Sequence, residues 1–201
     1  MIQIDDTGWG SLIGGVLVGV YRDESAEFTY GVVAPKFFQG EAFAAKAYIA
    51  EGGVQVAACF EHLHVRADEK ILCCTGYVLD GVCEWLAARG YKFERGKITG
   101  PLQGRIEGAL QDYLAGLGFA VDYKTLTQAD KKGLFWWKQV QWLKGGDVNA
   151  TRPVPERVAL CKTGWASFNT WANHPYREAR ALAQAAKSER SRKRWARRRE
   201  G

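Results

Sequence analysis

The first part of the chain shows the apolar runs and short turns of β-strands. Residues 2–6 read IQIDD, an apolar run that ends in two acids. The segments 14–21 (GGVLVGVY) and 27–34 (EFTYGVVA) are rich in β-branched residues, and turn-forming residues at 8–10 and 23–25 separate the three runs. Because the connections are short, we predict three consecutive antiparallel strands.

From residue 40 onward the spacing of apolar positions alternates between helical and extended. It predicts helical structure over 40–65 that breaks at Gly52–Gly53, strands over 70–77 and 92–99, and helices over 78–89 and 102–117. Three strands followed by helix–strand alternation predict an α/β fold with one mixed sheet. A long helical connection precedes the fourth strand, so we expect it to lie beside the first strand.

Aromatic residues dominate the apolar positions between residues 122 and 171. They are Phe135, Trp136, Trp137, Trp142, Trp165 and Trp171. The pattern there predicts a helix near 129–143, a strand over 157–162 and a last helix from residue 175. Two interpretations of the rings stay open: they pack in the core, or they form a platform on which nucleic-acid bases stack.

Composition limits the class of protein. The 201 residues are 47% hydrophobic and 25% charged, which indicates one globular core. No apolar stretch is long enough to cross a bilayer, and the N-terminus lacks the basic and apolar regions of a signal peptide. The five cysteines form no C-x-x-C pair, which favours a reducing compartment over a zinc or redox site. We therefore expect a cytoplasmic protein without a membrane partner.

The net charge is concentrated at the C-terminus. Residues 187–201 contain eight basic and two acidic side chains, and this surplus of six equals the net charge of the whole chain. A neutral body of residues 1–186 with a basic tail is suited to bind nucleic acid, because each phosphate that is neutralised releases counterions. The predicted phosphate contacts in the tail are Arg192, Lys193, Arg194, Arg197 and Arg198. The alternative is a solvated helix end that only aids solubility.

Two adjacent carboxylates are the first candidates for chemistry. Asp5 and Asp6 end the first strand just before the turn formed by Gly8, Trp9 and Gly10. Oxygen ligands at a strand end suit Mg²⁺ or Mn²⁺, and glycines let phosphate or sugar approach the backbone closely. Neighbouring side chains on a strand point to opposite faces, so both acids share a site only where the strand end twists. The alternative is a polar hairpin in which Asp accepts hydrogen bonds from turn amides.

The residues around this hairpin resemble a known enzyme family. The pattern I-D-[acid]-x-G-x-G-x-L-x-G-x-V over 4–16 resembles the opening of the type 2 ribonucleases H. The stretch 91–110 resembles the strand–Thr–Gly–helix segment of RuvC-type Holliday-junction resolvases, and 178–186 (EARALAQAA) is similar to their last helix. These families share the ribonuclease H-like fold, so the resemblance implies that fold for residues 1–186.

Several positions depart from the family pattern. Trp9 stands where the ribonucleases H have an arginine that contacts phosphate. The fourth strand ends without the glutamate that RuvC-type enzymes carry there, and Asp80 is the nearest acid. Arg180 occupies the place of an aspartate in the last helix, which leaves Glu178 and His174 as the nearest candidates.

The resemblance implies a nuclease that hydrolyses RNA–DNA hybrids or branched DNA with two Mg²⁺ or Mn²⁺ ions. Asp5 would be the bridging ligand, Asp80 and Glu178 the flanking ligands, and Asp6 a further ligand, while the Gly8–Gly10 turn would contact nucleic acid. The departures favour a second hypothesis, a non-catalytic nucleic-acid-binding protein with a degenerate site. An actin-like ATP-binding protein is disfavoured, because 201 residues cannot hold both lobes that its site needs. A homodimer is considered beside a monomer.

Overall fold

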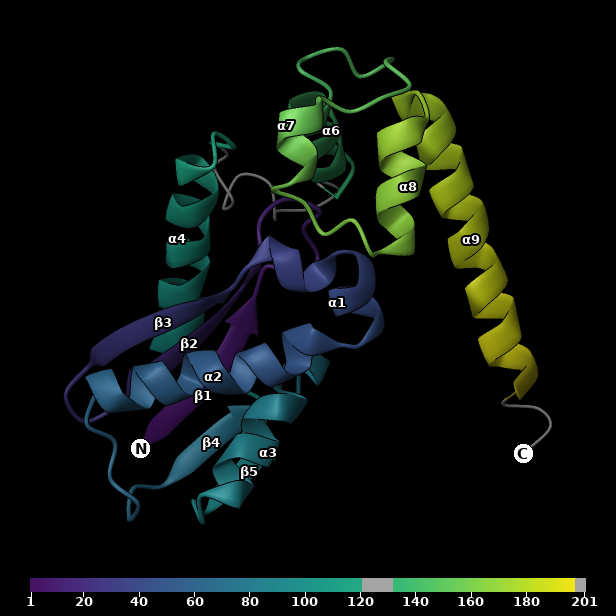
Figure 1. The fold of residues 1–201 in the computed structure, drawn as a ribbon. Helices are drawn as coiled ribbons and strands as arrows, with labels where there is room; N and C mark the ends of the chain where they lie inside the picture. The colour runs from purple at the N-terminus through teal and green to yellow at the C-terminus, as the bar shows by residue number, and fades with distance from the viewer. Residues whose placement is uncertain (121–131, 198–201) are drawn as a thin grey trace.

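Five strands form one mixed sheet at the centre of the fold (Figure 1). The computed structural model describes residues 1–120 and 132–197. The strands lie in the order β3-β2-β1-β4-β5 and are β1 (Ile2–Thr7), β2 (Val16–Arg22), β3 (Glu27–Val33), β4 (Ile71–Cys74) and β5 (Phe93–Gly96). β1, β2 and β3 are antiparallel neighbours, while β4 and β5 run parallel to β1. This topology confirms the predicted mixed sheet and is that of the ribonuclease H-like fold.

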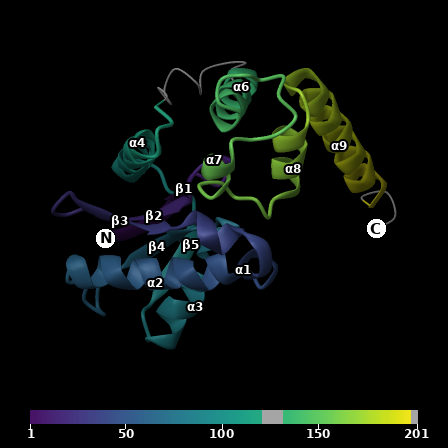
Figure 2. The same ribbon diagram turned by 45° about the horizontal axis from the view of Figure 1, so that its top comes forward.

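Helices cover both faces of the sheet (Figure 2). On one face lie α2 (Ala47–His62) and α3 (Asp80–Ala88), which follows the short 3₁₀ turn Tyr77–Leu79. On the other face lies α4 (Pro101–Gly116), whose buried stripe is Leu102, Ile106, Leu110 and Leu114. Side chains of β1 and β2 alternate between the two cores: Ile4 faces α2 and α3, and Leu17 faces α4.

The predicted break in the helix over 40–65 is wrong in position. A 3₁₀ turn, Pro35–Phe38, and the short helix α1 (Gly40–Ala44) come first, and the chain turns at Lys46, whose φ of 56° is left-handed. α2 then runs unbroken through Gly52–Gly53. The glycines serve packing instead: a Cβ on Gly53 would lie 2.9 Å from the carbonyl oxygen of Gly81 in α3. The missing side chains therefore let two helices approach closely.

Four helices within the described residues follow at the end of the sheet where β1 finishes. They are α6 (Lys132–Leu143), α7 (Pro155–Val158), α8 (Ala166–Asn173) and α9 (Tyr176–Arg197). The predicted strand over 157–162 is wrong, because Pro155 begins α7 and only a single β-bridge, Ile13 to Cys161, joins this segment to the hairpin. Residues 129–131 of the predicted helix over 129–143 lie outside the described residues.

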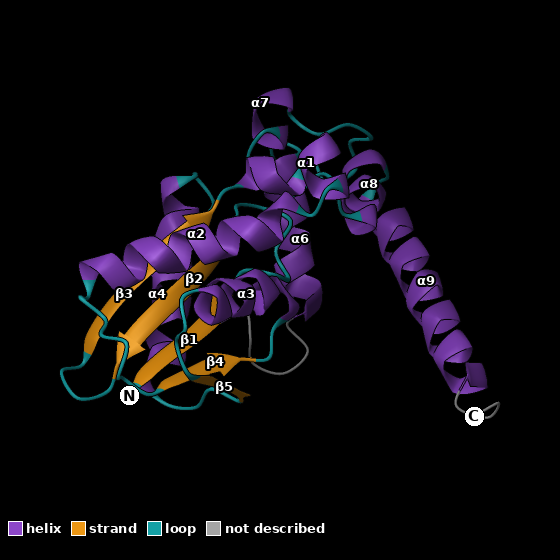
Figure 3. Ribbon diagram, turned by 60° about the horizontal axis from the view of Figure 1, so that its bottom comes forward, coloured by secondary structure: helices purple, strands orange, loops and turns teal. Residues whose placement is uncertain are grey.

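The last helix extends beyond the rest of the molecule (Figure 3). Its first turns are anchored, since Tyr176 and Ala179 are buried against α8 and the neighbouring core. From Gln184 to Arg192 the side chains are exposed on every face of the helix. None of the helices in the described ranges is long and apolar enough to span a membrane.

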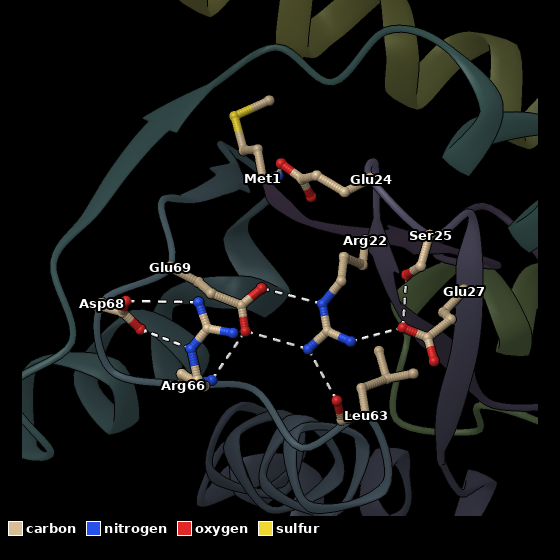
Figure 4. A network of polar contacts seen from close by, with 9 residues as sticks. All are labelled: Met1, Arg22, Glu24, Ser25, Glu27, Leu63, Arg66, Asp68 and Glu69. Carbon is tan, nitrogen blue, oxygen red and sulfur yellow. Dashed lines mark hydrogen bonds and ion pairs between the residues drawn. The ribbon is translucent and has the colours of Figure 1, made fainter.

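The opposite end of the sheet, where β1 begins, is closed by a network of charges (Figure 4). Arg22 at the end of β2 donates two hydrogen bonds to the Glu69 carboxylate, at 3.0 and 3.1 Å, one to Glu27 at 2.6 Å and one to the carbonyl of Leu63 at 2.8 Å. The Arg22 and Glu69 side chains are only 16% and 12% exposed. This network ties the β2–β3 hairpin to the loop that leads into β4.

Candidate functional site

The end of β1 carries the two acids of the hairpin on opposite faces of the sheet. Asp5 is 8% exposed and lies opposite Gly19 of β2, on the face that α4 covers. Asp6 follows Ile4 on the other face, where a side chain on Gly76 would collide with Oδ1 of Asp6. The alternation expected of a regular strand therefore holds, and the strand end does not turn both carboxylates into one site.

Burial changes the chemistry of this pair. It raises the pKa of Asp6 to about 6, with the nearby charge of Asp5 acting in the same direction. Asp5 Oδ1 accepts the backbone N–H of Asp6 at 2.9 Å. Burial raises the pKa of the Cys74 thiol, and a hydrogen bond with Asp5 raises it further. Cys74 ends β4, so a thiol stands beside Asp5 where the RuvC-type pattern has a glutamate.

The two predicted flanking ligands lie in other surroundings. Asp80 begins α3, on the face away from Asp5, and pairs with Arg95 of β5 at 2.7 Å. Glu178 in the first turn of α9 is 55% exposed and contacts Nδ1 of His174 at 2.8 Å. Among residues 1–120 and 132–197, no group of three or more His, Cys, Asp or Glu side chains could hold a metal ion.

The donors that the structure describes therefore do not fit a two-metal centre. Such a centre needs several carboxylates that converge from separate elements. The thiol of Cys74 is instead a side-chain hydrogen-bond partner of Asp5, and Mg²⁺ prefers oxygen ligands.

A buried lysine holds the turn after β1, and the sequence patterns did not reveal it. Lys162 has no exposed surface, and its Nζ donates to the carbonyls of Gly8 at 3.1 Å and Ser11 at 2.8 Å. Burial lowers the pKa of this amine to about 7. The buried amide of Gln139 in α6 accepts from the backbone N–H of Leu12 at 2.7 Å. Side chains from the C-terminal helices and loops thus fix the turn on which Trp9 is carried.

Trp9 stands at the centre of an aromatic cluster. Its ring centroid lies 5.2 Å from that of Trp165, 5.9 Å from Tyr48, 6.2 Å from Tyr77 and 6.3 Å from Phe38. Despite these four neighbours, 37% of Trp9 is exposed. The ring is therefore held in place by packing and still presents a surface to solvent.

A cavity of about 880 Å³ opens beside this ring, and we call it the aromatic cleft. Its ring-bearing lining is Trp9, Phe43, Tyr48, Trp136, Trp165 and Trp171, and its α9 side is Ala183, Ala186, Glu189 and Arg190. Trp136 of α6 and Trp171 of α8 are stacked, with centroids 5.0 Å apart and planes at 10°. The packing interpretation of the aromatic residues in 122–171 is confirmed for Trp171, which is buried in the core, while the stacking interpretation stays a prediction.

No protein-family model and no curated protein matches the chain. A solved structure, the catalytic core domain of BIV integrase, aligns over 93% of this chain and 97% of that chain with 16% identity and a TM-score of 0.34. The fold class rests on the order and directions of the five strands.

Proposed function

We propose that this protein binds nucleic acid, with the sugar–phosphate backbone lying along the basic part of α9. The observation that carries the proposal is the position of the net charge. The whole surplus of six positive charges lies in residues 187–201, and α9 continues as one helix through that segment to Arg197. Lys187, Arg190 and Arg192 are exposed on it.

A regular helix presents this charge in a form that suits a polyanion. Residues three and four apart lie on one side of a helix, so a cationic side chain recurs about once per turn from Lys187 onward. Phosphate contacts of this kind give affinity and position without reading sequence. The proposed contacts are Arg192, Lys193, Arg194, Arg197 and Arg198 of the tail, together with the turn of Gly8, Trp9 and Gly10, in which Trp9 and Gly10 are exposed and Gly8 is buried. Arg198 lies outside the described residues.

The test is a salt series on the full chain and on a chain truncated after Ala186. If the tail engages about five phosphates, log Kd should change with log salt with a slope of magnitude roughly 3.5 to 4.5. Truncation should remove most of that slope and weaken binding by about two orders of magnitude at low salt. A second variant, with Lys187, Arg190 and Arg192 changed to Gln, keeps the helix and should lose an intermediate part of the slope.

Fluorescence anisotropy with a labelled duplex, an RNA–DNA hybrid and a four-way junction measures these values. Circular dichroism of each variant checks that the body stays folded, as expected from the exposure of residues 187–192, the part of the deleted segment whose side chains the structure describes. A salt slope that truncation leaves unchanged would show that the tail is only a solvated helix end.

Hydrolysis of a hybrid or of branched DNA that depends on Mg²⁺ or Mn²⁺ is the second candidate function. The observation that favours it is the burial of two adjacent carboxylates at the end of the central strand, since groups with perturbed pKa values gather at functional sites. On this hypothesis Asp5→Asn abolishes cleavage and leaves the thermal midpoint unchanged or raised, because a like charge next to Asp6 is removed. Absence of cleavage of all three substrates by the wild type in either metal would contradict it.

A further inference from the structure

The aromatic cleft has the size and lining of a ligand site. Its volume of about 880 Å³ lies within the range of roughly 300 to 1,000 Å³ that is usual for sites that bind small molecules. Six aromatic side chains contribute to its wall, and a few polar groups, among them Ser167 and Thr170 of α8, interrupt it. Such a lining suits a flat ring that also carries polar atoms.

The ring that stands at the mouth of the cleft is preorganised. Lys162 binds the carbonyls of Gly8 and Ser11, which flank Trp9 on both sides in the chain. Phe43 packs directly against Gly164, where any side chain would overlap the Phe43 ring. Trp9 therefore does not have to be ordered when a ligand stacks on it, which lowers the entropic cost of binding.

The helix that borders the cleft supplies charge at one side. Ala183, Ala186 and Arg190 follow each other at spacings of three and four residues, so small side chains face the cleft and a cation follows them on the same face. Glu189 on the same turn also lines the cleft and disfavours a second anion beside it. A ligand that complements this arrangement has a flat ring at one end and one phosphate at the other.

We propose that the aromatic cleft takes one unpaired nucleotide of a nucleic acid whose backbone follows α9. The base stacks on Trp9, and its phosphate lies near Arg190. This inference rests on the proposed function and adds a substrate class to it: strands with overhanging, bulged or branch-point bases are preferred over a blunt duplex. Base-paired nucleotides cannot enter, because their rings are stacked inside the helix.

The experiment compares two labelled hairpins that differ only in the base at an unpaired position. One has a short 3′ overhang, and the other has the same overhang with abasic sites, so both carry the same number of phosphates. Removal of a base–aromatic stack weakens binding by roughly 5- to 150-fold. The wild type should therefore bind the first hairpin more tightly by a factor in that range.

Two variants test the cleft from opposite sides. Trp9→Ala removes the stacking ring, and Ala183→Trp fills the cleft from α9 without removing a buried group. Both should bind the two hairpins equally and keep the salt slope of the wild type. The matched control is Tyr30→Ala, an aromatic residue that is 41% exposed on β3 outside the cleft, which should keep the preference.

Each alternative result has a distinct meaning. If the wild type shows the full salt slope but does not distinguish the two hairpins, the proposed function stands and the nucleotide site is overturned. If no hairpin binds, both proposals are overturned. If sedimentation shows a dimer that Ala183→Trp dissociates, the cleft holds a second copy of the chain and the nucleotide site is again overturned.

Discussion

The two ends of the sheet use charged residues in different ways. Where β1 begins, opposite charges lie side by side: the Arg22 guanidinium contacts Glu69 and Glu27. Where β1 ends, Asp5, Asp6 and Lys162 are largely buried, and none of the three forms an ion pair with any residue that the structure describes. Where β1 begins, opposite charges neutralise each other inside the fold. Where β1 ends, the ionisable groups have no counter-charge among the described residues.

The pKa values of the two ends differ accordingly. Burial raises the pKa of Glu69, but the hydrogen bonds from Arg22 and from the backbone N–H of Arg66, together with the charges of both arginines, outweigh it and hold that pKa below its usual range. The pKa of Asp6 is raised to about 6 and that of Lys162 is lowered to about 7, both chiefly by burial. Folding gains nothing from a buried charge without a counter-charge. We therefore expect a ligand to bind at the end with Asp6 and Lys162.

The largest effect should come from Lys162→Met, which keeps the length of the side chain but removes the donor to Gly8 and Ser11. Two buried carbonyls then lack a partner, and the free energy of unfolding should fall by about 4 kcal/mol at pH 8.5. The pKa of Lys162 is lower in the folded protein than in the unfolded chain. Above pH 7 the unfolded chain therefore binds more protons than the folded protein, and the stability of the wild type rises with pH. The difference between wild type and variant should therefore grow by about 1.4 kcal/mol per pH unit from pH 7 to 8.5.

Urea unfolding at several pH values measures this dependence. The matched control is Lys144→Met, since Lys144 is also buried and also donates to two carbonyls, those of Ala150 and His174. Both variants should be destabilised, but only Lys162→Met should alter the fluorescence of Trp9 and the binding of an unpaired base. Equal effects of the two variants on binding would show that the contacts of Lys162 with the turn have no special role in binding.

At the opposite end, Arg22→Met should lower the free energy of unfolding by about 3 kcal/mol at pH 7, because it leaves the mostly buried carboxylate of Glu69 without its partner. The pKa of Glu69 is lower in the folded protein than in the unfolded chain. The stabilisation is therefore complete at a pH above the pKa of Glu69 in the unfolded chain, and it is lost as the pH falls through the pKa of Glu69 in the folded protein. The loss should therefore shrink at acidic pH. Nucleic-acid affinity, measured by anisotropy, should stay unchanged, and a weakened affinity would give this end a binding role. The exposed pair of Arg66 and Asp68 is the control, and its removal should matter little.

The smallest effect should be a gain in stability from Asp6→Asn. With a folded-state pKa near 6, the folded protein binds a proton between pH 4 and 6 that the unfolded chain does not, so wild-type stability falls as the pH rises through this window. The substitution should raise the free energy of unfolding by about 2 kcal/mol at pH 7 and by almost nothing at pH 4. Asp112→Asn, at an exposed position of α4, is the control. A destabilised Asp6→Asn variant would show that the carboxylate is needed by the fold.

The sheet could be predicted from the sequence because its signals are local. β-branched runs and short turns identify β1, β2 and β3, and the helical connection before Ile71 places β4 beside β1. The break expected at Gly52–Gly53 is wrong because these glycines serve a contact between distant parts of the chain. They let α2 approach α3, which lies about thirty residues further along the sequence. The strand expected over 157–162 failed because Pro155 starts a helix there.

The candidate site was harder to predict, because burial cannot be read from residue type. The sequence indicated Asp5, Asp6 and the basic tail, but the predicted ligands Asp80 and Glu178 lie on elements with other partners. Lys162 looks in the sequence like any surface lysine. The only local signal is its place at the end of the apolar run VALC, and its function depends on carbonyls about 150 residues earlier in the chain.

The close contact between α2 and α3 also bears on the order in which the chain folds. Each of the two adjacent glycines inside α2 costs about 1 kcal/mol of helix stability relative to alanine, and a helix of 16 residues is marginal alone even without them. On the other side of the contact, a Cβ on Gly81 would overlap the carbonyl of Ile49, so the two backbones fit only when both helices are formed. The β1–β3 meander has short-range contacts and can form first. During synthesis α2 can therefore pack on β2 and β3 first, and its close contact with α3 forms only after Ala88 has left the ribosome.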